Sequence, residues 1–124
     1  HHPKILLFYA AYNDIARGLN YYQINRLFLL FATQAAEKLK NTKCFFVSIK
    51  PSPFRKKFLK EITNTNNKIK KTINHLEKWK FIDICNPMLK AGYEKFYDQD
   101  QLHMNDLGYS LLSKSLRDEI AKIN

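Results

Sequence analysis

Short, almost wholly apolar runs alternate along this chain with longer segments in which apolar residues recur every three or four positions. The short runs are 4–10 (KILLFYA), 43–49 (KCFFVSI) and 81–85 (FIDIC). Runs of this length and composition are typical of strands that are covered on both faces. Because parallel strands need long crossover connections, usually helices, the alternation predicts a parallel sheet built from βαβ units.

The segments between these runs have the apolar stripe of an amphipathic helix. In 18–40 the stripe consists of Ile24, Leu27 or Phe28, Phe31, Ala35 and Leu39. Pro51 and Pro53 end the second strand, because proline cannot donate to a ladder and restricts the residue before it. A second helix follows, with a stripe of Phe58, Ile62, Ile69, Ile73 and Leu76. Its low-propensity residues 63–67 (TNTNN) predict an interruption.

The chain ends in a third amphipathic segment, for which Asn105 is the expected N-cap. Its apolar stripe consists of Leu112, Leu116, Ile120 and Ile123. Residues 1–124 therefore read as one α/β domain in the order β-α-β-α-β-loop-α, with helices on the faces of a three-stranded parallel sheet. Functional residues are expected in the loops at the carboxyl ends of the strands, 11–17, 50–55 and 86–104. We expect the third loop to be long and irregular.

Composition narrows the class of protein. The 124 residues leave room for one domain, and 45% hydrophobic residues support a packed core. The longest mainly apolar run, 27–33, is far shorter than the roughly 20 residues of a membrane-spanning helix. The three glycines form no phosphate-binding pattern. Cys44 and Cys85 fit neither a disulfide framework nor a zinc site, and are expected to be buried thiols. The histidines show no ligand spacing, so neither a metal nor a cofactor is expected.

The charge is strongly positive, with 21 lysines and arginines against 11 acidic residues and a net charge of +10. Nine of the basic residues lie within 54–80, a density that would attract phosphates and that makes a nucleic-acid-binding module one candidate function. No stacked aromatic motif accompanies them. A solvated basic surface is the preferred interpretation of this charge.

The strongest chemical signal is the pair Asp100 and His103, just before the last helix. A carboxylate three residues before an imidazole can fold back to accept the Nδ1 proton, which orients the ring and stabilises the imidazolium during proton transfer. The same spacing also occurs by chance, as an exposed histidine beside an aspartate that forms a turn.

Two further loops on the same expected rim carry candidate residues. Asn13, directly after the first strand, is placed to donate its amide to a developing oxyanion, or else it simply forms a turn with Asp14. In the rigid loop after the second strand, Arg55 either holds a carboxylate or supports the loop. Ser52 is placed as a nucleophile would be, although nothing nearby in the sequence activates it.

Taken in order, three segments of the chain resemble the SGNH/GDSL hydrolase family. KILLFYAAYNDIA (4–16) resembles the strand and loop of the Gly-x-Asn-Asp block of that family. FVSIKPSPFR (46–55) resembles the next strand and loop in one bacterial branch. DICNPMLKAGYEKFYDQDQLHMNDLGY (83–109) resembles the closing Asp-x-x-His block. The resemblance covers nearly the whole chain and implies a flavodoxin-like three-layer α/β/α sandwich that hydrolyses esters with a Ser-His-Asp arrangement.

The resemblance also implies a role for each matching residue. His103 would be the general base, Asp100 would orient it, Asn13 would be the side-chain donor of the oxyanion hole, and Asp14 would support the turn. Ala11 stands where the family usually has glycine, so a loop that needs a positive φ would be strained there.

The serine and glycine blocks of the family would both precede residue 1. We therefore expect a carboxyl-terminal portion of such a hydrolase, inactive alone, whose substrate in the intact protein is a small ester. The edge of strand 4–10 would then be open, so the isolated chain is expected to be poorly soluble, oligomeric or only partly ordered. Two alternatives are a non-catalytic SGNH-like binding protein and an enzyme in which Ser52 or Cys85 works with His103.

Overall fold

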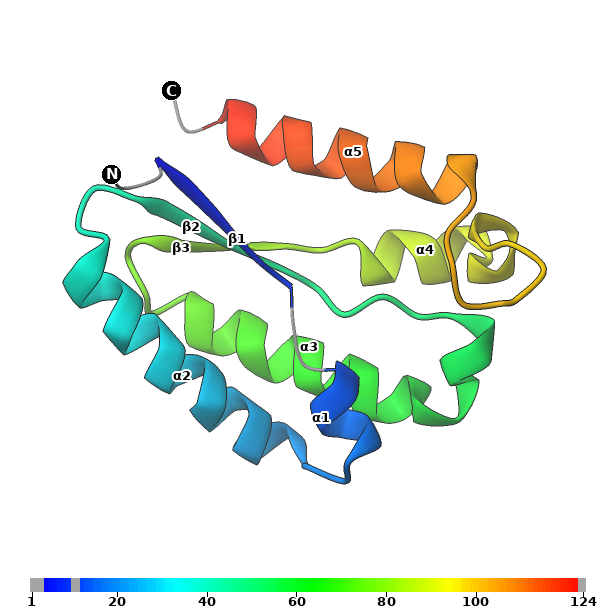
Figure 1. Cartoon of the computed structure of the whole chain (residues 1–124), viewed down its shortest axis with the longest axis horizontal. Helices are drawn as coiled ribbons and strands as arrows, with labels where there is room; N and C mark the ends of the chain where they lie inside the picture. Colours follow the sequence, from blue (N-terminus) through cyan, green and yellow to red (C-terminus); the bar gives the residue numbers. More distant parts are fainter. Residues whose placement is uncertain (1–3, 10–11, 123–124) are drawn as a thin grey trace.

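A parallel sheet of three strands forms the centre of the molecule (Figure 1). The computed structural model describes residues 4–9 and 12–122. The strands β1 (Ile5–Tyr9), β2 (Lys43–Val47) and β3 (Trp79–Ile82) lie in the spatial order β1-β2-β3. β2 pairs with β1 along its whole length, and its last four residues pair with β3. The predicted three-stranded parallel sheet is confirmed.

Helices cover both faces of the sheet, which gives three layers (Figure 1). α2 (Tyr21–Lys38) and α3 (Leu59–Ile73) pack on one face, and α5 (Asp106–Ala121) packs on the other. Shorter helical segments complete the chain: α1 (Tyr12–Ala16), η1 (Pro53–Phe58), α4 (Cys85–Ala91) and η2 (Tyr93–Phe96). The predicted three-layer α/β/α sandwich is confirmed.

The central strand β2 contributes to a core on each side, because successive strand residues point to opposite faces. Phe46 is completely buried under α2 and α3, where its ring centroid lies 5.3 Å from that of Phe28. Phe28 in turn meets Trp79 edge to face at 4.9 Å. Phe45, on the other side, is completely buried beneath α5. This double coverage explains why the strand is continuously apolar rather than alternating.

Both long helices on the first face differ from their predicted extents. α2 begins at Tyr21 rather than at residue 18, because Asn20 and Gln23 form a reciprocal capping box with distances of 2.9 Å. The predicted interruption at 63–67 is wrong, since α3 is continuous from Leu59 to Ile73. One of these residues, Asn66, is polar for a tertiary reason: it is buried, and its amide bonds the main chain of Ile49.

The third loop is more regular than predicted. The strand expected at 81–85 lies at Trp79–Ile82, and Cys85 already begins α4. The buried hydroxyl of Ser48 accepts hydrogen bonds from the N–H groups of Ile84 and Cys85, at 2.9 and 3.0 Å. This long-range contact supports the start of α4, and no local pattern could have indicated it.

The start predicted for the last helix is confirmed. The side chain of Asn105 accepts a hydrogen bond from the N–H of Gly108 at 3.0 Å, which makes it the N-cap of α5. Both cysteines are buried thiols, as predicted. Across residues 4–9 and 12–122, no helix combines the length and apolar character needed to cross a bilayer.

Candidate active site

All three strands run in the same direction, so the segments that follow them gather at one end of the sheet (Figure 1). This carboxyl-end rim holds α1 after β1, η1 after β2, and α4 with the following turn after β3. The candidate residues come from three of these segments: Asn13 from α1, Arg55 from η1, and Asp100 and His103 from the turn before α5. The topology therefore places them on one rim, as the sequence predicted.

Asp100 and His103 form a paired unit in this turn. The Nδ1 atom of His103 lies 2.5 Å from Oδ2 of Asp100. The other carboxylate oxygen accepts hydrogen bonds from the main-chain N–H groups of Leu102 and His103, both at 2.9 Å. The hydrogen bond from His103 is the largest of the interactions that lower the pKa of Asp100 to about 2. The carboxylate is therefore ionised throughout the neutral range.

The imidazole has one nitrogen engaged and one open. Because Nδ1 faces the carboxylate, the shared proton is assigned to Nδ1, and Nε2 is the nitrogen available for proton transfer. The His103 side chain is 72% exposed, so the ring borders solvent rather than the core. A ring oriented by an ionised carboxylate and open at Nε2 has the geometry of a general base.

A tight turn presents this pair. Gln101 has a φ of 64°, which lets the chain reverse between Asp100 and His103. The N–H of Asp98 donates to the His103 carbonyl at 2.8 Å, and that of Gln101 donates to the Asp98 carbonyl at 2.9 Å. An antiparallel bridge between Tyr97 and Met104 closes the base of the turn.

A small apolar cluster supports the turn from below. Met88, Phe96, Tyr97 and Met104 are buried together against α5. The Nδ2 of Asn105 also donates to the main-chain carbonyl of Tyr97 at 3.2 Å. A packed base of this kind limits the movement of the exposed Asp100 and His103 side chains.

The two residues of α1 lie in different surroundings. Asn13 is exposed and, among the described residues, its side chain makes no hydrogen bond. Asp14 pairs with Arg17 at 3.6 Å, so its side chain holds the end of α1. Ala11, where we expected strain, lies outside the described residues.

Two cations, Lys50 and Arg55, lie in the segment that follows β2. The Arg55 guanidinium lies 3.8 Å from the centre of the Tyr12 ring. Lys50 is half-buried, and its pKa is lowered first by burial and then by the positive charge of Arg55. Lys50 was not among the site residues predicted from the sequence. Its place between a buried strand and Pro51 was the available signal.

Two contacts join η1 and the residues just before it to the turn that carries His103. The N–H of Phe54 donates to the carbonyl of Gln101 at 3.0 Å, and the hydroxyl of Tyr97 donates to the carbonyl of Pro51. Burial raises the pKa of Tyr97 to about 12, so its hydroxyl stays protonated as a donor. Through η1, the turn is connected to α1 as well, because Arg55 stacks on Tyr12.

The alternative nucleophiles within the chain receive little support from their surroundings. Ser52 is buried, and in the described part of the chain its hydroxyl has no hydrogen-bond partner. Burial is the largest cause that raises the pKa of Cys85 to about 11, so almost no thiolate exists at neutral pH. Neither side chain bonds to His103.

The basic residues of 54–80 lie on several elements rather than on one. They extend from η1 through α3 to β3. Some have local partners: Lys57 lies over Phe58, Lys68 lies over Tyr22, and Lys78 donates to the carbonyl of Lys40. Nucleic-acid binding stays an untested alternative. Over the described ranges, no group of three or more His, Cys, Asp or Glu side chains could hold a metal ion.

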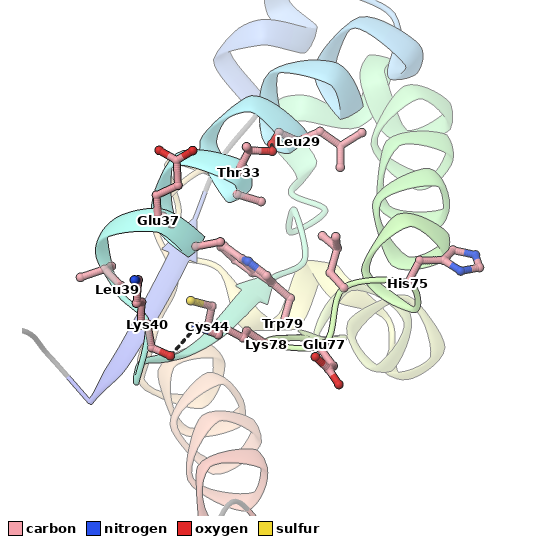
Figure 2. Close-up of a pocket in the computed structure, with 14 residues that line it drawn as sticks. Leu29, Thr33, Glu37, Leu39, Lys40, Cys44, His75, Glu77, Lys78 and Trp79 are labelled. Atoms are coloured by element: carbon pink, nitrogen blue, oxygen red, sulfur yellow. Dashed lines mark hydrogen bonds between the residues drawn. The ribbon is translucent and has the colours of Figure 1, made fainter.

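A groove of about 690 Å³ lies at the other end of the molecule, near the amino ends of β2 and β3 (Figure 2). Leu29, Cys44 and Trp79 contribute to its lining, and Glu37 and Lys40 also border it. Neither Asp100 nor His103 lines it. The groove is therefore separate from the candidate active site.

Comparison with known structures identifies the fold. A protein from Streptococcus pneumoniae that is provisionally described as a platelet activating factor matches with a TM-score of 0.81 at 21% identity, over 94% of this chain and 59% of its own. A carbohydrate esterase family 3 protein from Talaromyces cellulolyticus matches with a TM-score of 0.79 at 16% identity, over 98% of this chain and 58% of its own.

The chain therefore shares the three-layer α/β/α fold of these two structures. No family model and no curated protein sequence matches the chain. The chain spans somewhat less than three fifths of the length of each neighbour. At these identities the likeness establishes the fold, and the chemistry has to be argued from the site.

Proposed function

We propose that this chain supplies the His-Asp half of a serine ester hydrolase of the SGNH type. The observation that carries the proposal is the 2.5 Å contact between His103 Nδ1 and Asp100 Oδ2, in a turn on the carboxyl-end rim of the sheet. Two neighbours with the same fold are esterase-like proteins, which supports the reaction class. The substrate is a small ester.

In this proposal, His103 Nε2 accepts the hydroxyl proton of a serine as the serine oxygen attacks the ester carbonyl carbon. Ionised Asp100 stabilises the resulting imidazolium and keeps the ring oriented. The imidazolium then returns the proton to the departing alkoxide. A water molecule then attacks the acyl carbon of the acyl-enzyme while His103 accepts its proton. The imidazolium returns this proton to the departing serine oxygen, which releases the acid. The exposed Asn13 amide donates to the oxyanion in each tetrahedral intermediate, and Asp14 holds α1 through Arg17.

The serine is proposed to come from a segment outside the 124 residues. β1 is an edge strand with apolar, half-buried side chains, and such an edge is a template for a further strand. Beside it, α2 exposes Leu27, Leu30 and Phe31, and the Phe31 ring centroid lies 4.7 Å from that of Phe8. A segment that pairs with β1 would cover this apolar surface. The chain alone is then inactive.

The test compares this chain with the longer product encoded upstream of it. A fluorophosphonate probe should label a serine in the longer product and leave the 124-residue chain unlabelled. His103→Ala should reduce ester hydrolysis by the longer product about 10³-fold or more. His75→Ala is the matched control, because His75 is exposed and lies beside the distant groove.

Three results would reject the proposal. One is labelling of the 124-residue chain itself, which would place the nucleophile within it. Another is an upstream region without a reactive serine. The third is equal activity of the His103→Ala and His75→Ala proteins.

A further inference from the structure

Two partly buried cations, Lys50 and Arg55, lie in the segment after β2, beside the turn that carries His103, and are called the cationic pair below. Lys50 lies between two buried residues, Ile49, which is 5% exposed, and Pro51. Arg55 lies against Tyr12, with its guanidinium 3.8 Å from the ring centre. The two charges are near enough that Arg55 contributes to the lowered pKa of Lys50. The contact with Tyr12 therefore holds the Arg55 guanidinium, and Lys50 adds a second, partly buried charge in the same segment.

No acidic side chain neutralises the pair within the described residues. The ion pairs found there join Arg17 to Asp14, Lys122 to Glu119 and His103 to Asp100. Another acid on the rim, Asp83, is engaged by the main-chain and side-chain N–H groups of Asn86, at 3.0 and 2.8 Å. Two like charges that are partly removed from water disfavour each other, and an anion between them would relieve that cost.

The pair is also connected directly to the catalytic turn. Phe54, next to Arg55, donates its N–H to Gln101 at 3.0 Å, and Gln101 lies between Asp100 and His103. Pro51, next to Lys50, accepts a hydrogen bond from Tyr97 at the base of the same turn. A ligand held by the two cations would therefore lie on the rim that carries the general base.

We propose that Lys50 and Arg55 bind an anionic group of the substrate, a carboxylate or a phosphate, and so select esters that carry a negative charge. The inference rests on the proposed function, because it assigns a substrate class to the same site. Stacking on Tyr12 fixes the plane of the guanidinium, and its N–H edge matches the oxygens of either anion. Lys50 adds a point charge from the start of the same segment.

The first test measures anion binding by the 124-residue chain at constant ionic strength. Sodium phosphate and sodium acetate are titrated separately at pH 7.5, with chloride as the balancing anion, and the amide signals of Phe54 and Arg55 are followed by NMR. Saturable binding is expected, and the tighter of the two anions identifies the preferred group. Lys50→Met and Arg55→Met should each weaken it at least tenfold. Lys60→Met, on the exposed face of α3, should leave it unchanged.

Two results would overturn the inference: amide chemical-shift changes that do not saturate with anion concentration, or an equal loss of anion affinity in Lys60→Met. Either result indicates general attraction to a basic surface. A variant that does not fold is recognised in the same spectra, because its amide signals are poorly dispersed. For such a case, Arg55→Lys is the second variant, since it keeps the charge and removes the planar N–H edge. It should weaken binding less than Arg55→Met.

The second test separates this inference from the proposed function. In the serine-containing longer protein, the ratio of kcat/KM for an anionic ester to that for its neutral analogue is measured. Lys50→Met should lower this ratio at least tenfold through KM, whereas Lys60→Met should not. Hydrolysis without any preference for the anionic ester would overturn this inference alone. Saturable anion binding without hydrolysis would overturn the proposed function and leave the anion site standing.

Discussion

The side chain of Asn66 satisfies both main-chain polar groups of Ile49. Its Oδ1 accepts the Ile49 N–H at 2.8 Å, and its Nδ2 donates to the Ile49 carbonyl at 3.0 Å. Ile49 lies just beyond β2, where the ladder has ended, and both residues are buried. The contact joins α3 to the loop that begins with Lys50, and so it positions one side of the candidate site.

Replacing Asn66 with alanine should therefore lower the free energy of unfolding by about 2 to 4 kcal/mol, because two buried main-chain groups lose their partners. Urea unfolding followed by circular dichroism measures the change. Asn67→Ala, at an exposed position of the same helix, is the control and should shift stability by less than about 0.5 kcal/mol. Equal effects of the two substitutions would contradict the assigned role of Asn66.

Gly108 should tolerate no side chain. A Cβ at this position would lie 2.5 Å from the carbonyl oxygen of Phe96, within the cluster that supports the catalytic turn. Gly108→Ala should cost about 1 to 3 kcal/mol of unfolding free energy. It should also speed hydrogen exchange at the amides of Asp98 and Gln101, which are bonded within the turn. Ser110→Ala, exposed on the same helix, should do neither.

The Asp100 carboxyl should titrate near pH 2 and respond to its neighbour. Its pKa is lowered from 3.8 chiefly by the His103 hydrogen bond, so His103→Ala should raise it toward 3.8. Since the pKa is lower in the folded state, the pair contributes stability above about pH 4 and loses that contribution as the pH falls toward 2. Carboxyl ¹³C shifts measure the titration. An unchanged pKa in His103→Ala would show that the contact does not persist in solution.

The isolated chain should associate through its open β1 edge and the adjacent α2 surface. Leu30, which is 58% exposed, is the position for a test, and Leu30→Lys should shift the sedimentation profile toward monomer. Tyr109→Lys, at a similarly exposed position on α5, should have no effect. A wild-type monomer with a sharp, reversible and concentration-independent melting transition would contradict the prediction.

Cys85 should be unreactive in the folded chain. Because burial raises its pKa to about 11, iodoacetamide at pH 7.5 should modify it only at the rate of unfolding. Mass spectrometry of native and urea-unfolded protein gives the comparison. Rapid native labelling that is lost in His103→Ala would restore the cysteine as a candidate nucleophile.

Local patterns predicted much of this molecule because they report burial and backbone preference. The apolar runs identified three strands, although β3 lies two to three residues earlier than expected, and the polar side chain of Asn105 identified the start of α5. The Asp100 and His103 pair could be predicted for the same reason, since both partners lie within one turn. Asn13 was selected by its place after a strand, and its role stays a proposal.

Tertiary structure decided what depends on partners far apart in the chain. Within residues 63–67, which continue a helix, Asn66 bonds Ile49, and at the start of α4 the N–H groups of Ile84 and Cys85 bond Ser48. The position of the Arg55 guanidinium depends on Tyr12, which belongs to another strand-end segment. These contacts leave no periodic trace in the sequence, because each joins single residues across the fold rather than repeating along one element.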